Sequence, residues 1–185
     1  MNGKKQSIVD LVVLGILIKE PMNAYKLTAY VDQNHLVRML KVSAPAIYKS
    51  CKRMLTSGYL RGKSQKHSGT PEMMVYTVSA SGKRQFNKLL RHFANQQVGY
   101  YLDINSVVYC LEGMAEKEGL ELIDSISTEI QAMQLWLSKH IEQAEKSGSF
   151  GAHMIVKQYL MVAKTLVEWS SLLRSEFIKN RKGGK

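Results

Sequence analysis

The feature that most constrains the fold is one short interval of strand-like sequence inside a chain that is otherwise helical. Residues 59–65 alternate as a strand does, and residues 73–78 do so again. The segment between them, Lys66-His67-Ser68-Gly69-Thr70-Pro71, is rich in turn-forming residues. We therefore expect a mainly α-helical protein with one small β-hairpin that has a basic tip.

Three helices are expected before the hairpin, at residues 8–20, 23–33 and 43–57. Pro21 ends the first helix, which carries an apolar face. That face consists of Ile8, Leu11, Val12, Gly15 and Ile16. Ser7, Asn23 and Ser43 are good N-cap residues for the three helices, and Gly58 can close the third in a left-handed conformation.

A fourth helix is expected after the hairpin, at residues 79–97. Its buried side is predicted to consist of Phe86, Leu89, Leu90 and Phe93. Three helices, a hairpin and a further helix follow one another as in a winged helix-turn-helix domain, whose third helix can enter the major groove of DNA. Residues 1–99 are therefore predicted to form a DNA-binding domain.

Residues 100–185 are expected to form a helical domain for dimerisation and a possible effector. Ser147-Gly148-Ser149 can turn the chain into an antiparallel helical hairpin. Apolar residues recur at heptad-like spacing on both arms, so a second subunit is the expected partner, although an intramolecular bundle is the alternative. The predicted dimerisation residues are Ile123, Ile126, Ile130, Met133, Leu137, Tyr159, Val162, Leu166, Trp169 and Leu173.

The two halves of the chain differ sharply in charge. Residues 1–99 hold 16 Lys or Arg and 4 Asp or Glu, a net charge of +12, whereas residues 100–185 hold 10 and 11, a net charge of −1. This asymmetry indicates that the first half binds a polyanion, although a basic surface that serves only solubility is the alternative.

Location and redox state follow from other features of the sequence. The longest apolar stretch, residues 8–18, contains Asp10 and is much shorter than the roughly 20 residues of a membrane-spanning helix. No small-residue cleavage site of a signal peptide follows it. The two cysteines, Cys51 and Cys110, do not suggest a disulfide. We expect a cytoplasmic protein with no membrane partner.

Three segments together resemble the PadR family of bacterial transcriptional regulators. They are LGILIKEPMNAYKLTAYV at residues 14–31, VSAPAIYKSCKRMLTSGYL at 42–60 and GTPEMMVYTVSASGK at 69–83. The helical region after residue 100 looks like that of the larger, subfamily 1 type. The resemblance implies a winged domain that binds DNA and a C-terminal domain that pairs into a dimer.

The chain departs from the family pattern at three places. Residues 23–26 read Asn-Ala-Tyr-Lys where the family often has His-Gly-Tyr-Glu, Glu72 stands where Arg is common, and Lys49 stands where many relatives have proline. These changes leave the expected fold intact. They prevent any operator sequence from being carried over.

The candidate DNA-binding residues come from three elements. Positions on the third helix that lie away from its apolar side can face a groove. These are Ala44, Pro45, Tyr48, Lys49 and Lys52, with Ser43 at the helix start. The hairpin adds Lys63, Lys66 and His67, and the start of the second helix adds Tyr25 and Lys26 by resemblance and by position. Hydroxyl and ammonium groups suit phosphate oxygens, although each single Lys is also compatible with an ordinary solvated charge. Arg53 can point inward or outward.

Aromatic residues leave the presence of an effector open. Phe93, Tyr100, Tyr101, Trp136 and Trp169 can line a pocket for a small aromatic or apolar effector. Aromatic residues at helical spacing are more commonly part of a core.

No enzyme, metal site or cofactor is expected. The chain has no Gly-rich phosphate loop and no metal-ligand spacing among its five histidines and two cysteines. We therefore expect a dimeric, sequence-selective regulator of transcription, a repressor, that binds double-stranded DNA. The alternative is an architectural or protein-interaction module without sequence-selective DNA binding.

Overall fold

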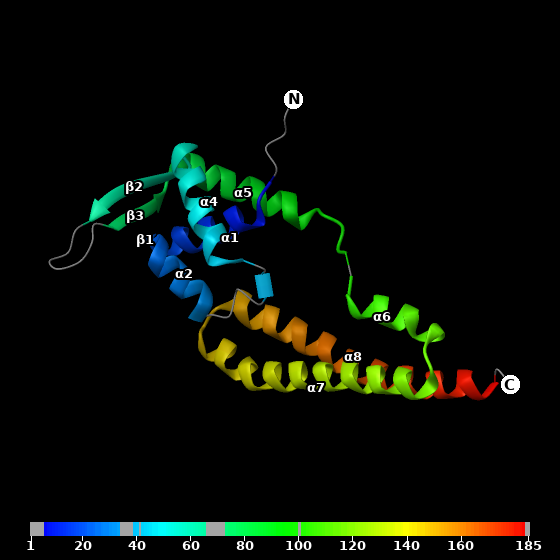
Figure 1. Ribbon diagram of the computed structural model, residues 1–185. Coiled ribbons are helices and arrows are strands. Elements are labelled where there is room, and N and C mark those ends of the chain that lie inside the picture. Colours follow the sequence, from blue (N-terminus) through cyan, green and yellow to red (C-terminus); the bar gives the residue numbers. More distant parts are fainter. Residues whose placement is uncertain (1–5, 34–38, 41, 66–72, 100, 184–185) are drawn as a thin grey trace, which may run out of the picture. The chain divides into compact units, whose positions relative to one another are not determined.

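The computed structural model describes residues 6–33, 39–40, 42–65, 73–99 and 101–183. The chain divides into two compact units, unit 1 at Met1–Val98 and unit 2 at Gly99–Lys185, which are described separately. Figure 1 shows a small sheet and short helices in unit 1, and long helices in unit 2. Among the described residues, no helix is both long and apolar enough to cross a membrane.

Unit 1 has the predicted order of helices and strands, with one strand that the sequence did not reveal. The elements are α1 (Ile8–Lys19), β1 (Met22–Asn23), α2 (Ala24–Gln33), α4 (Ala44–Thr56), β2 (Leu60–Gln65), β3 (Met73–Val78) and α5 (Ala80–Ala94). The unpredicted strand β1 pairs antiparallel with β3, so the sheet order is β1-β3-β2. Two residues directly after a proline carry no periodicity, which is why β1 escaped prediction.

Helix α1 is the centre of the core of unit 1. Val13, Leu14 and Leu17 are almost fully buried, and α1 contacts α4, α5 and β3. The predicted apolar face was partly wrong, because Ile8 is 43% exposed. Helix α1 is apolar around most of its circumference, so periodicity could not identify its buried side. Leu90 on α5 was also wrongly predicted to be buried and is 43% exposed.

Helix ends in unit 1 use fewer capping side chains than expected. Ser7 and Ser43 occupy N-cap positions, but neither side chain forms a cap hydrogen bond. Asn23 does cap α2, since its Oδ1 accepts a hydrogen bond of 2.8 Å from the backbone N–H of Lys26. Gly58 has a φ of +71°, the left-handed conformation predicted for the end of α4.

A dense polar junction joins the sheet to α5. The Ser79 hydroxyl accepts from the backbone N–H of Gly82 at 3.0 Å and donates to the Gly58 carbonyl at 2.7 Å. The Ser81 hydroxyl also donates to the Gly58 carbonyl, at 2.8 Å. Gly82 lies so close to the preceding turn that a Cβ atom there would be 2.1 Å from the Tyr59 carbonyl oxygen. Only glycine fits at this position without moving the backbone.

Replacing this glycine should therefore destabilise the protein. We expect Gly82→Ala to lower the free energy of unfolding of unit 1 by about 2 kcal/mol, the usual effect of overpacking a dense site. The matched control is Gly151→Ala in the first turn of another helix, where a Cβ meets nothing within 4 Å. Urea unfolding followed by circular dichroism measures both, and equal stability of the two variants would contradict the prediction.

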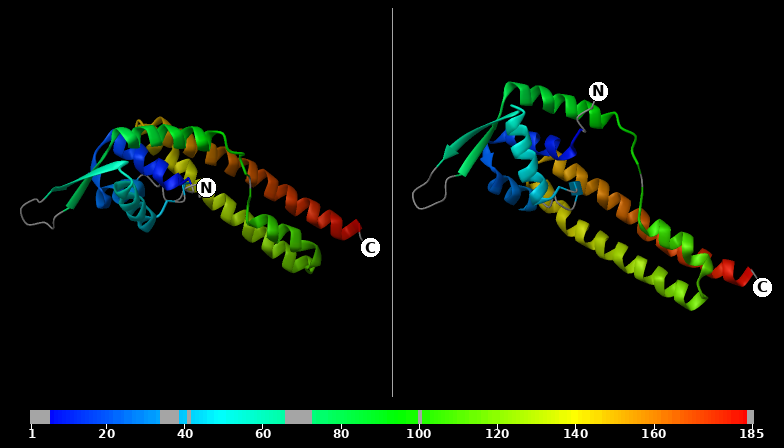
Figure 2. Two further views of the ribbon diagram at one scale, coloured as in Figure 1. Left: turned by 90° about the horizontal axis from the view of Figure 1, so that it is seen from above. Right: turned by 45° about the horizontal axis from the view of Figure 1, so that its top comes forward.

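Unit 2 is built on an antiparallel pair of long helices. Its elements are α6 (Ile104–Cys110), the 3-10 turn η1 (Leu111–Gly113), α7 (Glu116–Lys146) and α8 (Phe150–Gly183). Helices α7 and α8 lie side by side along most of their length in all three views (Figures 1 and 2). Gly148, with a φ of +67°, makes the turn between them where the sequence predicted it.

Small side chains let α7 and α8 approach closely. Buried residues recur every seven positions, at Ile123, Ile130 and Leu137 on α7 and at Val156, Ala163, Ser170 and Phe177 on α8. At Gly119 on α7 a Cβ would lie 2.4 Å from the Phe177 ring. This seven-residue repeat is the seam of the hairpin.

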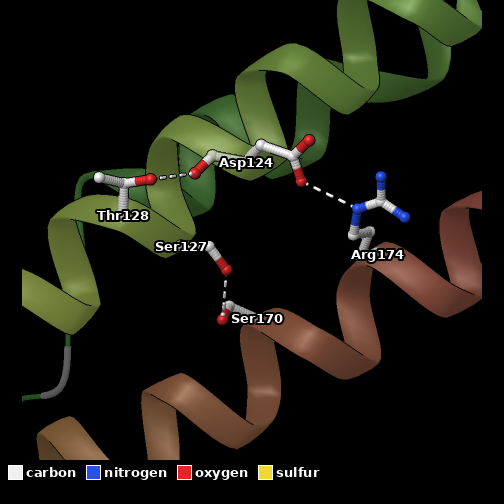
Figure 3. Close-up of polar contacts among 5 residues, drawn as sticks. All are labelled: Asp124, Ser127, Thr128, Ser170 and Arg174. Atoms are coloured by element: carbon white, nitrogen blue, oxygen red, sulfur yellow. Dashed lines mark hydrogen bonds and ion pairs between the residues drawn. The ribbon is translucent and has the colours of Figure 1, made fainter.

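Polar contacts cross the seam and fix its register. The Ser127 hydroxyl donates to the buried Ser170 hydroxyl at 2.7 Å, and Ser170 donates to the Val167 carbonyl at 2.9 Å. One turn away, Arg174 Nε donates to Asp124 Oδ1 at 2.9 Å (Figure 3). A shift of α8 along α7 would break both contacts, so they select one alignment of the two apolar stripes.

Candidate nucleic-acid interface

The outer face of α4 carries the predicted groove-facing residues. Pro45, Tyr48, Lys49 and Lys52 are exposed, and Tyr48 has 49% of its surface accessible. The opposite side of the helix is buried through Ile47, Ser50, Cys51 and Met54. Of the other two predicted residues, Ser43 is exposed and Ala44 is half-buried. Helix α4 therefore presents two ammonium groups and a phenol to solvent on a rigid element.

A polar anchor that the sequence did not reveal fixes α4 against α1. Asp10 of α1 accepts a hydrogen bond from the buried Ser50 hydroxyl and forms an ion pair with Arg53. Arg53 is thereby directed toward α1, which decides the orientation that the sequence left open. Because Asp10 was interpreted only as a first-turn residue of its own helix, a contact over 40 residues was not foreseen.

The start of α2 lies beside the sheet. Tyr25 is 69% exposed and Lys26 is exposed, so both can reach a ligand in solvent. Asn23 positions them, because it caps α2 and also donates from Nδ2 to the Met73 sulfur at 3.1 Å. The asparagine that departs from the family pattern thus ties α2 to β3.

The described part of the hairpin places only Lys63 of its three predicted residues. Lys63 is exposed on β2, on the opposite face of the strand from Gly62, where a Cβ would lie 3.4 Å from Leu55 of α4. Lys63 therefore points to the side of β2 opposite the one that meets Leu55. Lys66 and His67 lie outside the described residues.

Cys51 lies on the buried side of α4, in the core of unit 1. Burial raises the pKa of its thiol to about 11, and the nearby Asp10 carboxylate adds to the increase. Burial also raises the pKa of Tyr76 on β3, with smaller contributions from Cys51 and Tyr48. Cys51 is therefore a protonated core residue, in contrast to the exposed Cys110 of unit 2.

The two thiols should react at very different rates. At pH 8 we expect a maleimide to modify Cys110 within minutes and Cys51 only after unfolding, since Cys51 is buried and protonated. Mass spectrometry of the modified peptides measures this. Because its folded pKa is raised, Cys51 contributes stability that is complete below pH 9 and is lost as the pH rises toward 11. Rapid labelling of Cys51 in the folded protein would contradict the prediction.

The predicted dimerisation residues fall into three groups. Ile123, Ile130 and Leu137 are buried within the single chain. Met133 and Tyr159 are 37% and 39% exposed. The half-buried group comprises Ile126, Val162, Leu166, Trp169 and Leu173. Unit 2 also exposes apolar residues that the heptad pattern missed, namely Leu135, Met154, Met161 and Leu172.

The aromatic residues named as possible effector contacts have separate environments. Phe93 packs on the core of unit 1, Trp136 stacks on His140 with ring centroids 4.1 Å apart, and Trp169 is half-buried. Tyr101 is 93% exposed, and Tyr100 lies outside the described residues.

Unit 2 also has an open hollow of about 990 Å³ beside the end of α8, lined in part by Leu111, Phe177 and Arg181. The guanidinium of Arg181 donates to the carbonyls of Leu111, Glu112 and Met114, at 3.0, 3.1 and 2.7 Å. This cation is therefore engaged in holding the corner between η1 and α7. Among the described residues, no group of three or more His, Cys, Asp or Glu side chains could hold a metal ion.

Comparisons with known proteins identify the fold. No protein-family model and no curated protein matches the chain. The structure of Bacillus subtilis PadR in complex with operator DNA matches with a TM-score of 0.81 at 18% identity, covering 92% of this chain and 99% of that one. The same protein in complex with p-coumaric acid gives a TM-score of 0.78 at 18% identity, with the same coverage. The Vibrio cholerae virulence activator AphA gives 0.69 at 10% identity, over 92% and 98% of the two chains. The chain therefore has the fold of the PadR transcriptional regulators, as the sequence resemblance predicted.

Proposed function

We propose that the chain is a transcriptional regulator that binds double-stranded DNA selectively, as a homodimer. The observation that carries this proposal is the exposed face of α4, on which Tyr48, Lys49 and Lys52 stand clear of the core. A recognition helix of this kind lies in the major groove in winged and helix-turn-helix domains. The net charge of +12 on residues 1–99 and the likeness to a PadR that was crystallised with operator DNA support the proposal.

The chemistry of α4 suggests how it would bind. Lysine and tyrosine groups donate to phosphate oxygens, which fix the position of the protein on the duplex. Pro45 and Ala44 offer apolar contact to a thymine methyl group. Tyr25 and Lys26 at the start of α2 would hold the flanking phosphates. Arg53 is paired with Asp10 of α1, so it would hold α4 against α1 instead of binding DNA.

This division of labour predicts different effects for neighbouring cations. We expect Lys49→Gln with Lys52→Gln to lower the slope of log affinity against log salt by about 2, since each lost phosphate contact removes about 0.9. Arg53→Gln should leave that slope unchanged and reduce the stability of unit 1 by about 1 kcal/mol. Fluorescence anisotropy on a labelled duplex over a salt series, with thermal unfolding, measures both. A slope that falls equally in the two variants would contradict these roles.

Selectivity separates this function from its alternative, an architectural or protein-interaction module. A duplex from upstream of the protein's own gene should bind more tightly than a scrambled duplex at the same salt concentration. Equal affinity for the two would favour the alternative. We expect repression as the mode of action. The p-coumaric acid complex of the similar PadR supports only the proposal of a small aromatic or apolar effector.

Unit 2 would pair two subunits through its remaining apolar surface. Met161 and Leu172 are 63% and 56% exposed, and they share one side of α8 with the half-buried Trp169. Met133 and Tyr159 are also exposed, but they lie closer to the seam. Contiguous exposed apolar residues on a monomer commonly mark a protein interface. Since Ile123, Ile130 and Leu137 already close the hairpin, the pairing surface would consist of the exposed residues and the half-buried ones beside them.

A charge on this surface should therefore weaken the dimer. We expect Leu172→Glu to raise the dimer dissociation constant at least about tenfold, because a carboxylate would be buried against apolar surface. Ser171→Glu, at the neighbouring exposed and polar position, is the matched control and should pair as the wild type does. Light scattering over a dilution series measures both. Unchanged pairing of the Leu172 variant would exclude this face.

A further inference from the structure

Helix α5 carries a second basic surface that the proposed contacts of α4 do not use. Lys83, Arg84, Lys88 and Arg91 are all exposed, and α5 contains no acidic residue. Within the described part of the chain, none of the four forms an ion pair. The stripe formed by Arg84, Lys88 and Arg91, called the α5 stripe below, is the strongest uncompensated charge on a described helix.

The α5 stripe lies opposite the core side of its helix. Gly82, Phe86, Leu89 and Phe93 form the inner side, and Gly82 and Leu89 are buried. Arg84, Lys88 and Arg91 follow one another at spacings of four and three, so they share one side of the helix. At about 100° per residue, that side points away from the inner one. The three cations are therefore exposed on the solvent side of α5.

Repulsion among these charges opposes the stability of the helix. Like charges at i,i+4 and i,i+3 repel one another, and only Arg91, in the last turn, is favoured by the helix dipole. The exposed faces of unit 2 are built differently, because they pair opposite charges at Lys146–Glu142 and Lys179–Glu176. In solvent alone this arrangement of like charges does not stabilise α5, whereas a bound polyanion would relieve the repulsion and stabilise the helix.

The α5 stripe does not share a direction with the groove-facing side of α4. Both helices pack on α1, and they lie on different sides of it (Figure 2). Each turns its exposed side away from α1, so the two basic surfaces diverge. A straight duplex held by α4 would not run along α5.

We propose that the α5 stripe binds the phosphate backbone of a second segment of duplex DNA, so that the protein can bridge two duplex segments. The inference rests on the proposed function of α4. Arg84 and Arg91 are seven residues apart, about 10 Å along the helix axis. A duplex carries one negative charge per about 1.7 Å of its axis, so a segment of this length offers several phosphates to the three flexible cations. The contact reads no bases, so the second segment can have any sequence.

A two-duplex capture experiment tests this proposal. A duplex from upstream of the protein's own gene is fixed on beads and loaded with protein, and a fluorescent scrambled duplex is then added. We expect the wild type to retain the second duplex. Arg84→Gln with Lys88→Gln and Arg91→Gln should load the beads as the wild type does but capture at least about tenfold less second duplex, because three phosphate contacts are lost. The matched control removes three charges from unit 2, at Lys139, Lys157 and Lys164.

The outcomes separate the two proposals. Capture by the α5 variant at the wild-type level, or an equal loss in the unit 2 control, would overturn the role of the α5 stripe. Loading of the first duplex without any capture by the wild type would overturn the stripe alone, whereas failure to load the first duplex would overturn the proposed function as well. The melting temperature of the α5 variant should not fall, since its substitutions remove like-charge repulsion.

Discussion

The packing of α4, α5 and β3 around α1 is the constraint on which unit 1 depends. Val13, Leu14 and Leu17 are almost fully buried, and α4, α5 and β3 all pack on this helix. Its single acidic residue, Asp10, supplies a polar contact within that packing by holding Ser50 and Arg53 of α4. Hydrophobic burial thus sets where α4 lies, and one carboxylate sets its rotation. The exposed side of α4 is a consequence of both.

Local signals in the sequence were sufficient for the order of elements in unit 1 apart from β1. Alternation identified β2 and β3, and Gly58 marked the end of α4, because turn and strand chemistry acts between near neighbours. Contacts between distant residues were not accessible in that way. The hydrogen bond from Ser50 to Asp10 spans 40 residues, and no pattern in either helix predicts it. Of the candidate DNA-binding residues, the exposure of those on α4 could be predicted from helical geometry. The side of β2 that carries Lys63 could not, because it depends on how β2 packs against α4.

The seven-residue repeat of unit 2 was predicted correctly on α7, whereas the buried positions of α8, which are Val156, Ala163, Ser170 and Phe177, were not among the predicted residues. Ile123, Ile130 and Leu137 pack within the chain, because Gly119, Ala163 and Ser170 are small enough to let α8 come close. Periodicity shows that a helix has an apolar side, but it does not show which surface covers that side. The small residues on the facing positions are the signal that could have distinguished the two.

The contact of Arg181 with the corner after α6 has a consequence for the order in which unit 2 folds. The turn at Gly148 brings the ends of α7 and α8 together first, and each further turn of the seam then closes only a short additional loop. Arg181 meets Leu111 across 70 residues, at the opposite end from that turn. We therefore expect its three hydrogen bonds to form after the seam between α7 and α8 has closed. We also expect them to open first in thermal fluctuations, so that hydrogen exchange spreads into the hairpin from this corner inward.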